Sequence, residues 1–350
     1  MTRSTRDVSP GDHVCAVPLS EEQLWEVSAD FVADGLDRHE RVLYFDDGTA
    51  EGVLDRLADD HVAFERPLRT GQLAIVPAEA TRAVFHTPLP EARAMMLEHI
   101  EGSKAAGYTG FRMTGQMSHG VDRRWPAPFA EYDRELDALV RERGITALCL
   151  YDRRRYSDEQ IERMRDVHRK ELSVPTAYDD GLLRVVRTGP TSARLAGEVD
   201  HSNRPAIARL LETTLDDALR SHSAPTDIVL NLASLRFIDV ASAVSLVHAA
   251  EGFPDTHRLV LSDVRPGVLR VLDRCGAPFA AQLTVHEFDG TTDAGRTGPG
   301  PVVGPGRHGG GPGHGNGGTT GNGGTTGNGG GPPWTTDGHG DGYPHLREAR

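Results

Sequence analysis

The chain has 350 residues, of which 37% are hydrophobic and 25% charged, and its formal net charge is -13. This charge argues against a nucleic-acid-binding protein, because phosphate contacts need clustered lysine and arginine. It favours a protein that meets other proteins or small molecules. The length allows about two domains of roughly 150 residues each.

Three cysteines, Cys15, Cys149 and Cys275, lie far apart in the chain and form no CxxC pair. That pattern favours free thiols in a reducing compartment. The first residues contain no apolar run of the kind found in signal peptides. No stretch of about 18 apolar residues is present to span a membrane. We therefore expect a cytoplasmic protein.

Short apolar runs alternate with helical patterns through the first part of the chain. We expect strands at 13–17, 41–45, 73–76, 110–114 and 145–151. Helices are expected after a Ser20 cap, at 50–57, 92–100 and 129–143, and from about 158 to 170. Such alternation predicts βαβ units with right-handed crossovers and a mainly parallel sheet.

Ligands of such sheets bind beyond the carboxyl ends of the strands. The polar residues expected at or beside those ends are our candidates for ligand binding: His13, Cys15, Asp46, Asp47, Thr114, Gln116, Tyr151, Asp152, Arg153 and Arg154. Met117 and His119 follow one of these strands and are weaker candidates.

A second α/β unit is predicted at 182–288. Strands are expected at 182–187, 193–199, 227–232, 257–261 and 282–287, with helices at 206–219, after Asp239, and at 268–273. From 291 to 350 the chain is rich in Gly, Pro, Thr, Asn and His. That composition buries too little apolar surface to offset the entropy of ordering, so we expect a disordered tail. We interpret the histidines of this tail as solvated side chains rather than metal ligands: His308, His314, His339 and His345.

Two motifs of the second unit carry a resemblance. A strand ending in LAGEVD precedes the long helix, and IVLNLASLRFIDVASAVSL follows at 228–246. This order resembles the STAS domain of anti-sigma-factor antagonists, over 182–288. The resemblance implies a bacterial signalling protein whose partner is an anti-sigma factor or serine-kinase-type regulator.

In many STAS antagonists a Ser or Thr two residues after the Asp is phosphorylated, and the added charge breaks the complex. Here that position is Ala241, which has no hydroxyl. Ser242 is either a substitute acceptor or a small helix residue that packs on the sheet. Asp239 either caps the helix or shapes the partner surface, and both roles are compatible. We take these three as the candidate switch residues.

The first unit resembles the MEDS sensory domain over 11–172. The resemblance lies in GDHVCAV (11–17), FVADGLDRHERVLYFDD (31–47), RMTGQMS (112–118) and ALCLYDRRRY (147–156). The second segment is also similar to the region after the phosphate loop in KaiC-type ATPases, which implies a RecA-like core. However, HVCAVPLSEEQL (13–24) has neither the glycines nor the lysine of a phosphate loop. We therefore expect no ATP hydrolysis.

His13 and Cys15 are two residues apart on an expected strand, so their side chains point to the same face. Four readings are open: a packed core pair, a ligand or redox sensor, a thiol nucleophile, or a metal site completed by His119 or Cys149. At 151–155, the arginines of YDRRR either hold an anionic ligand or pair with carboxylates. We expect no metal and no cofactor.

These features predict a sensor coupled to a partner-binding domain, which acts on sigma-factor or stress signalling without catalysis. The alternative is a residual nucleotide-binding or thiol enzyme centred on Cys15, and a passive scaffold is a third reading. The expected partner is a regulatory protein. A small-molecule ligand and self-association into a homo-oligomer are compatible with the sequence, and we expect no binding to nucleic acid or membrane.

Overall fold

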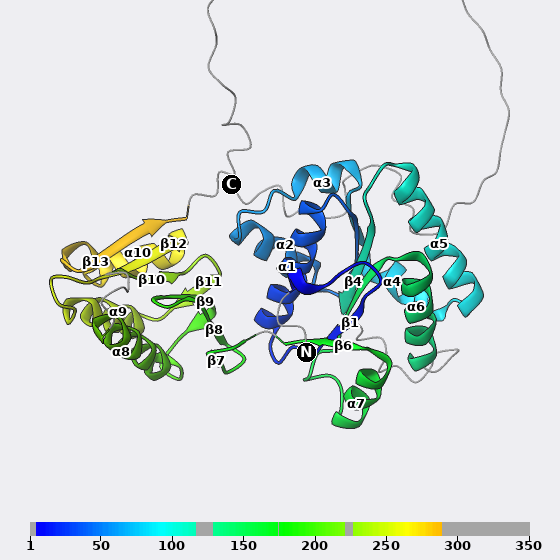
Figure 1. Ribbon diagram of the computed structural model, residues 1–350. Coiled ribbons are helices and arrows are strands. Elements are labelled where there is room, and N and C mark those ends of the chain that lie inside the picture. Colours follow the sequence, from blue (N-terminus) through cyan, green and yellow to red (C-terminus); the bar gives the residue numbers. More distant parts are fainter. Residues whose placement is uncertain (1–4, 117–128, 174, 221–226, 289–350) are drawn as a thin grey trace, which may run out of the picture.

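The structure, a computed structural model, describes residues 5–116, 129–173, 175–220 and 227–288. It contains two α/β units that lie side by side (Figure 1). The expected tail at 291–350 and the weaker candidates Met117 and His119 lie outside the described residues.

The first unit is a six-stranded sheet in the order β3-β2-β4-β5-β1-β6, with every neighbouring pair parallel. Its strands are β1 (His13–Ala16), β2 (Arg41–Phe45), β3 (Leu73–Val76), β4 (Phe111–Gln116), β5 (Thr146–Leu150) and β6 (Lys170–Leu172). Its helices are η1 (Thr5–Asp7), α1 (Glu21–Asp37), α2 (Ala50–Asp59), α3 (Glu65–Thr70), α4 (Ala78–His86), α5 (Leu89–Ala105), α6 (Phe129–Arg143) and α7 (Asp158–Val167). The predicted α/β class with a mainly parallel sheet is confirmed.

One local prediction is wrong. The helix expected to reach residue 170 ends at Val167, and the chain then enters β6. His168 has an extended backbone conformation. The following residues pair with β1 at the edge of the sheet. Backbone hydrogen bonds to a neighbouring strand replace those of another helical turn, and the helical pattern carries no sign of that strand.

The two faces of this sheet carry different helices because side chains alternate along each strand. Val14 and Leu148 point to the side covered by α1. Phe45 and Ala147 point to the other side, where α4, α5 and α6 pack. Both faces are thus covered, which explains why β1 and β5 are buried along their whole length.

The second unit has a mixed sheet in the order β13-β12-β10-β9-β8-β7, with β11 paired to β9. Its elements are β7 (Tyr178–Asp179), β8 (Leu183–Gly189), β9 (Ser192–Val199), α8 (Arg204–Arg220), β10 (Asp227–Asn231), β11 (Leu235–Ile238), α9 (Val240–Glu251), β12 (Arg258–Val264), α10 (Pro266–Arg274), η3 (Ala277–Phe279) and β13 (Leu283–Glu287). β7, β8 and β9 are antiparallel neighbours, and the other pairs are parallel. Apolar side chains from both the sheet and the helices form a core of their own.

Charged side chains join the two units where α1 and α2 face the second sheet (Figure 1). Arg184 of β8 donates to Glu26 of α1 at 2.7 Å, and the Arg184 side chain is 1% exposed. Asp59, the last residue of α2, accepts from Ser234 at 2.7 Å and pairs with Arg265. We call this contact region the seam.

The edge of the seam adds pairs of the same kind. Arg194 pairs with Asp60, and Arg236 pairs with Glu22. The Arg236 guanidinium also lies 4.8 Å from the centroid of the Trp25 ring. In all four of these ion pairs, a carboxylate of the first unit meets an arginine of the second.

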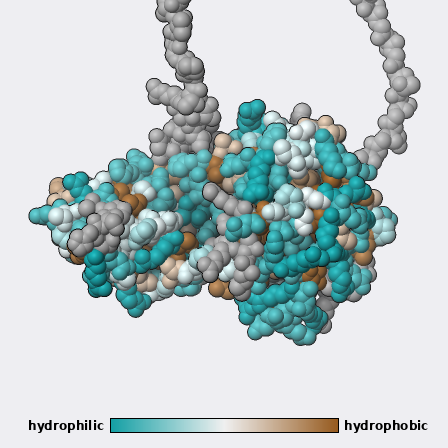
Figure 2. All heavy atoms as spheres, viewed as in Figure 1, coloured by the Kyte–Doolittle hydropathy of each residue, from teal (hydrophilic) through white to brown (hydrophobic). Residues whose placement is uncertain are grey.

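The visible surface of both units is mainly hydrophilic, with scattered hydrophobic residues (Figure 2). Among the described residues, no helix combines the length and hydropathy needed to cross a bilayer.

Candidate functional site

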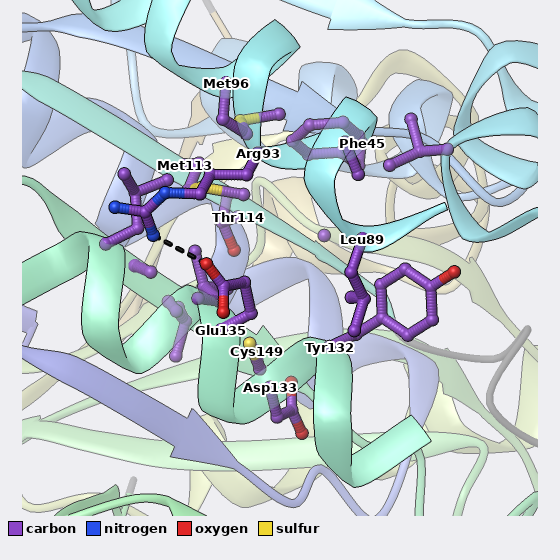
Figure 3. Close-up of a pocket in the computed structure, with 17 residues that line it drawn as sticks. Phe45, Leu89, Arg93, Met96, Met113, Thr114, Tyr132, Asp133, Glu135 and Cys149 are labelled. Carbon is purple, nitrogen blue, oxygen red and sulfur yellow. Dashed lines mark hydrogen bonds and ion pairs between the residues drawn. The ribbon is translucent and has the colours of Figure 1, made fainter. Parts of the chain in front are cut away.

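A cavity of about 100 Å³ lies between the sheet of the first unit and the helices α4, α5 and α6. Figure 3 shows Phe45, Met96, Met113 and Leu89 around it. Apolar side chains form most of the wall, and the further apolar residues are Val84, Ala92, Leu136, Leu139 and Ala147. Such a lining favours apolar or weakly polar molecules.

Small residues in the middle of the sheet leave this space open. Gly115 of β4 and Ala147 of β5 line the cavity where larger side chains would fill it. A Cβ at Gly115 would lie 2.5 Å from the carbonyl oxygen of Phe45. Glycine is therefore required there for β2 and β4 to stay paired.

Two polar contacts tie the covering helices together beside the cavity. Arg93 of α5 donates to Glu135 of α6 at 2.6 Å, drawn as a dashed line in Figure 3. The Tyr132 hydroxyl donates to the carbonyl oxygen of Thr87 at 2.7 Å. These contacts hold α5 and α6 over the sheet and leave the cavity wall apolar.

One end of the cavity is polar. Asp133 and Cys149 line it, as Figure 3 shows, and His13 and His168 lie directly behind them. His13 Nε2 is 3.4 Å from Cys149 Sγ, and the two imidazole rings have centroids 4.1 Å apart. We call these four side chains the cluster. Their exposed fractions are 3% for His13, 1% for Asp133, 3% for Cys149 and 7% for His168.

Four different segments supply the cluster. His13 opens β1, Cys149 lies in β5, Asp133 faces inward from α6, and His168 follows the last turn of α7. The parallel pairing sets Cys15 beside Cys149 and His13 beside Ala147. The side chains of these four strand residues therefore point to the same side of the sheet.

Burial shifts the pKa of every side chain in the cluster toward the neutral form. It lowers the pKa of His13, with a further contribution from His168, and it lowers the pKa of His168 itself. Burial raises the pKa of Cys149 well above its ordinary value and that of Asp133 to about 7. The neutral form is favoured because the interior solvates ions poorly.

Cys15, a candidate from the sequence, lies beside the cluster. Its side chain is buried, and its Sγ is 3.8 Å from the carbonyl oxygen of Lys170. Burial raises the pKa of Cys15 to about 12. The thiolate, which is the nucleophile and the redox-active form, is therefore scarce near neutral pH.

The predicted strand-end residues separate into two groups. Tyr151 donates to Asp133 at 2.7 Å, and Thr114 lines the cavity. Asp46 instead caps α2, because it accepts from the backbone N–H groups of Thr49 and Ala50 at 2.8 Å. Gln116 is buried, and its amide has no hydrogen-bond partner among the described residues.

The arginines at 153–155 pair with carboxylates. Arg154 donates to Asp152 at 2.8 Å, and Arg153 lies 2.5 Å from Asp158. Arg155 reaches Asp47 at 3.4 Å. Burial acts against ionisation of Asp152, but its hydrogen bonds from Arg154 lower its pKa overall. These contacts match the second of the two readings left open for YDRRR, while ligand binding by these residues stays a prediction.

Asp133 and His168 were missed from the sequence. In the sequence of α6, Asp133 stands among apolar positions that face the sheet: Tyr132, Leu136, Leu139 and Val140. A carboxylate on an apolar face signals a buried polar group. His168 follows Ile161 and Met164 at helical spacing, so the same test applied to α7 would have found it.

In the second unit, Asp239 caps α9 by accepting from the Ser242 N–H at 2.6 Å. Ser242 is 1% exposed, and its hydroxyl accepts from Arg204 at 3.1 Å. Ala241 is exposed. Phe237 is 49% and Val240 66% exposed, so apolar surface surrounds this turn.

Comparisons with known proteins agree with this division. Residues 12–169 match the family model "MEthanogen/methylotroph, DcmR Sensory domain", or MEDS, and residues 184–287 match the STAS domain. Both resemblances and their order along the chain are thereby confirmed. A search of curated proteins found no match.

Two solved structures are similar to part of the chain. The flagellar accessory protein FlaH from Methanocaldococcus jannaschii is 9% identical with a TM-score of 0.37, over 54% of this chain and 79% of that one. A KaiC-like protein from Pyrococcus horikoshii is 16% identical with a TM-score of 0.36, over 51% and 78%.

Proposed function

We propose that this chain is a sensor–effector signalling protein. The MEDS unit binds a small, largely apolar molecule in the cavity, and the STAS unit binds a regulatory protein. The cavity itself supports the proposed ligand binding by the MEDS unit, because it is apolar along its walls and polar at one end. An apolar cavity of about 150 Å³ is enough for benzene in another protein, so the ligand here is at most about the size of a single aromatic ring.

The cavity is tested with fluorobenzene as a probe, followed by ¹⁹F NMR on the full chain. Ala92 lines the cavity from α5, whereas Ala94 is exposed on the same helix. We expect saturable binding by the natural chain and by Ala94→Phe. Ala92→Phe should bind at least about tenfold more weakly, because the ring occupies the space. Equal binding by both variants would place the probe elsewhere.

For the effector half, we propose an anti-sigma factor of the serine-kinase type as the partner of the turn between β11 and α9. The exposed Phe237 and Val240 on either side of the Asp239 cap support a contact surface there. The full chain as bait should capture such a partner, and Val240→Asp should weaken capture at least about tenfold. Recovery of no kinase-like or sigma-pathway protein would count against this partner.

Phosphorylation of Ser242 is disfavoured by its burial and its bond from Arg204. We therefore expect Ala241→Asp to reduce partner affinity more than Ser242→Asp does, once both variants are shown to fold. A larger effect at Ser242 would show that the switch uses the buried position.

We also propose that the chain is not an enzyme. The alternative, a thiol or residual nucleotide enzyme centred on Cys15, is opposed by a buried thiol whose pKa is raised to about 12. Cys15→Ser should leave signalling intact, and ATP with magnesium should not shift the unfolding temperature. Covalent labelling of Cys15 by a substrate-like electrophile, together with loss of signalling in Cys15→Ser, would support the enzyme instead. A passive scaffold is distinguished by self-association that no ligand or oxidant changes.

A further inference from the structure

The cluster presents four donor atoms to a single point. One atom each from His13, Asp133, Cys149 and His168 lies within 4.8 Å of every other. Ligand atoms around one tetrahedral ion are about 3.5 Å apart, given metal–ligand bonds of about 2.0 to 2.3 Å. Side-chain shifts of roughly 1 Å would therefore bring all four to bonding distance.

Two of these side chains, His168 and Asp133, have a hydrogen bond from the protein at one polar atom and none at the other. His168 Nδ1 contacts the carbonyl oxygen of Met164 at 2.7 Å, which fixes Nδ1 as the protonated nitrogen. Its Nε2 then carries a lone pair and has no hydrogen-bond partner in the described part of the chain. The Tyr151 hydroxyl holds Asp133 Oδ2, and within the same residues Asp133 Oδ1 has no partner.

This arrangement is costly without an occupant. Both unpartnered atoms lie on side chains that are more than nine-tenths buried. A buried polar atom without a hydrogen bond loses its hydration without compensation, which destabilises the fold. The bonds from Met164 and Tyr151 have the form of the outer contacts that orient metal ligands.

His13 completes the set, although its Nδ1 has no hydrogen-bond partner among the described residues. Its Nε2 faces Cys149 Sγ at 3.4 Å, the spacing of two ligands on one ion. Its Nδ1 lies 3.8 Å from Asp137 Oδ1. With Nε2 on a metal, the Nδ1–H would point toward that carboxylate, which is a common outer-shell partner of metal-bound histidine.

We propose that the cluster is a mononuclear metal centre with two imidazole nitrogens, one thiolate and one carboxylate oxygen as ligands. Mixed nitrogen and sulfur donors in a tetrahedral set select zinc or a similar divalent first-row ion over magnesium or calcium. Binding converts the Cys149 thiol to a thiolate and releases its proton to solvent. The inference is independent of the ligand proposed for the cavity, but it places an ion at the cavity's polar end.

Cobalt(II) serves as the probe because a thiolate ligand gives it a near-ultraviolet charge-transfer band and a tetrahedral site gives visible d–d bands. The full chain should bind one cobalt with both signals, and zinc should displace it. Native mass spectrometry should show one added ion per chain. Absence of binding, or bands typical of six oxygen ligands, would overturn the proposal.

Variants locate the site. Cys149→Ser should remove the charge-transfer band, while Cys15→Ser and Cys275→Ser should keep it. Asp133→Asn and His168→Gln should each weaken zinc binding more than about 100-fold, beyond the usual effect of an outer-shell change. If Cys149→Ser does not fold, the zinc affinities of Asp133→Asn and His168→Gln, which keep all three thiols, show whether the cluster binds the metal.

The tail histidines need their own control, because they could bind metal without the cluster. A full chain with asparagine at His308, His314, His339 and His345 should retain both cobalt signals and the same affinity. Loss of the signals in that variant, with the cluster unchanged, would assign the metal to the tail and overturn the proposal. Because no step of this test uses fluorobenzene, its failure and that of the cavity proposal are separable.

Discussion

The cluster and the seam both bury polar side chains, but they satisfy them differently. At the seam, Glu26 meets Arg184 and Asp59 meets Arg265, so each buried carboxylate has a cation from the chain itself, although Arg184 Nη2 has no hydrogen-bond partner among the described residues. In the cluster, Asp133 and His168 keep one polar atom each without a hydrogen bond from the described residues. Paired groups specify how two parts of a protein fit together. Groups left open at a cavity point to something from outside the chain.

The two regions also lie on opposite faces of the same sheet. The seam involves α1 and α2, whereas the cluster lies on the side covered by α6. Side chains alternate between the faces, so His13 belongs to the cluster while the next residue, Val14, packs with α1. In the proposed sensor, a signal from the cavity to the STAS unit would cross one layer of strands.

The largest expected effect is at the centre of the seam. Arg184→Met should lower the free energy of unfolding by about 3–5 kcal/mol, because it leaves the Glu26 carboxylate buried without its cation. Urea denaturation followed by circular dichroism measures this. Arg187→Met, on the exposed part of the same strand, is the matched control and should change stability by no more than about 0.5 kcal/mol.

Adding Glu26→Gln to Arg184→Met should recover part of the loss, since the group left behind is then neutral. Equal effects of Arg184→Met and Arg187→Met would show that the seam pair does not form in solution.

The second prediction concerns metal-linked stability. Zinc at 100 times its dissociation constant should stabilise the natural chain by about 2.7 kcal/mol. Arg184→Met should keep this increment in full, because the seam does not contact the cluster. Asp133→Asn, which preserves the bond from Tyr151, should lose it. Calorimetry with and without zinc gives both numbers, and loss of the increment in both variants would mean that the two regions are not independent.

Local features of the fold were predictable from the sequence and long-range pairs were not. The strands at 41–45 and 73–76 have the same bounds in the structure, because their β-branched and apolar runs are local signals. Arg184 and Glu26 are 158 residues apart, and nothing near either one indicates the other. His13 and Cys149 were both singled out, but their meeting depends on the pairing of β1 with β5. Only the packing of α6 and α7 adds Asp133 and His168.

The third prediction disturbs the seam without changing its charge. A Cβ at Gly52 of α2 would lie 2.3 Å from the Trp25 ring. Gly52→Ala should therefore cost about 1–3 kcal/mol as Trp25 is displaced. Gly102 is a helical glycine in α5, and a Cβ added there would meet no atom closer than 3.8 Å. Gly102→Ala should instead stabilise the chain by up to about 1 kcal/mol, and the same sign at both sites would contradict the packing described for Trp25.

The smallest effect is expected at the edge of the seam. Arg236 contacts the Trp25 ring and is 39% exposed, and a glutamine amide can still donate to the buried Glu22 carboxylate, so Arg236→Gln should cost only about 1 kcal/mol, and added salt should reduce the difference. Because Gly52→Ala and Arg236→Gln both act through Trp25, the double variant should lose less than the sum of the two single losses. Strict additivity, measured by urea denaturation, would mean that Trp25 does not link α2 to Arg236. The seam would then depend on the buried pairs at its centre alone, and Trp25 would belong to the packing of the first unit.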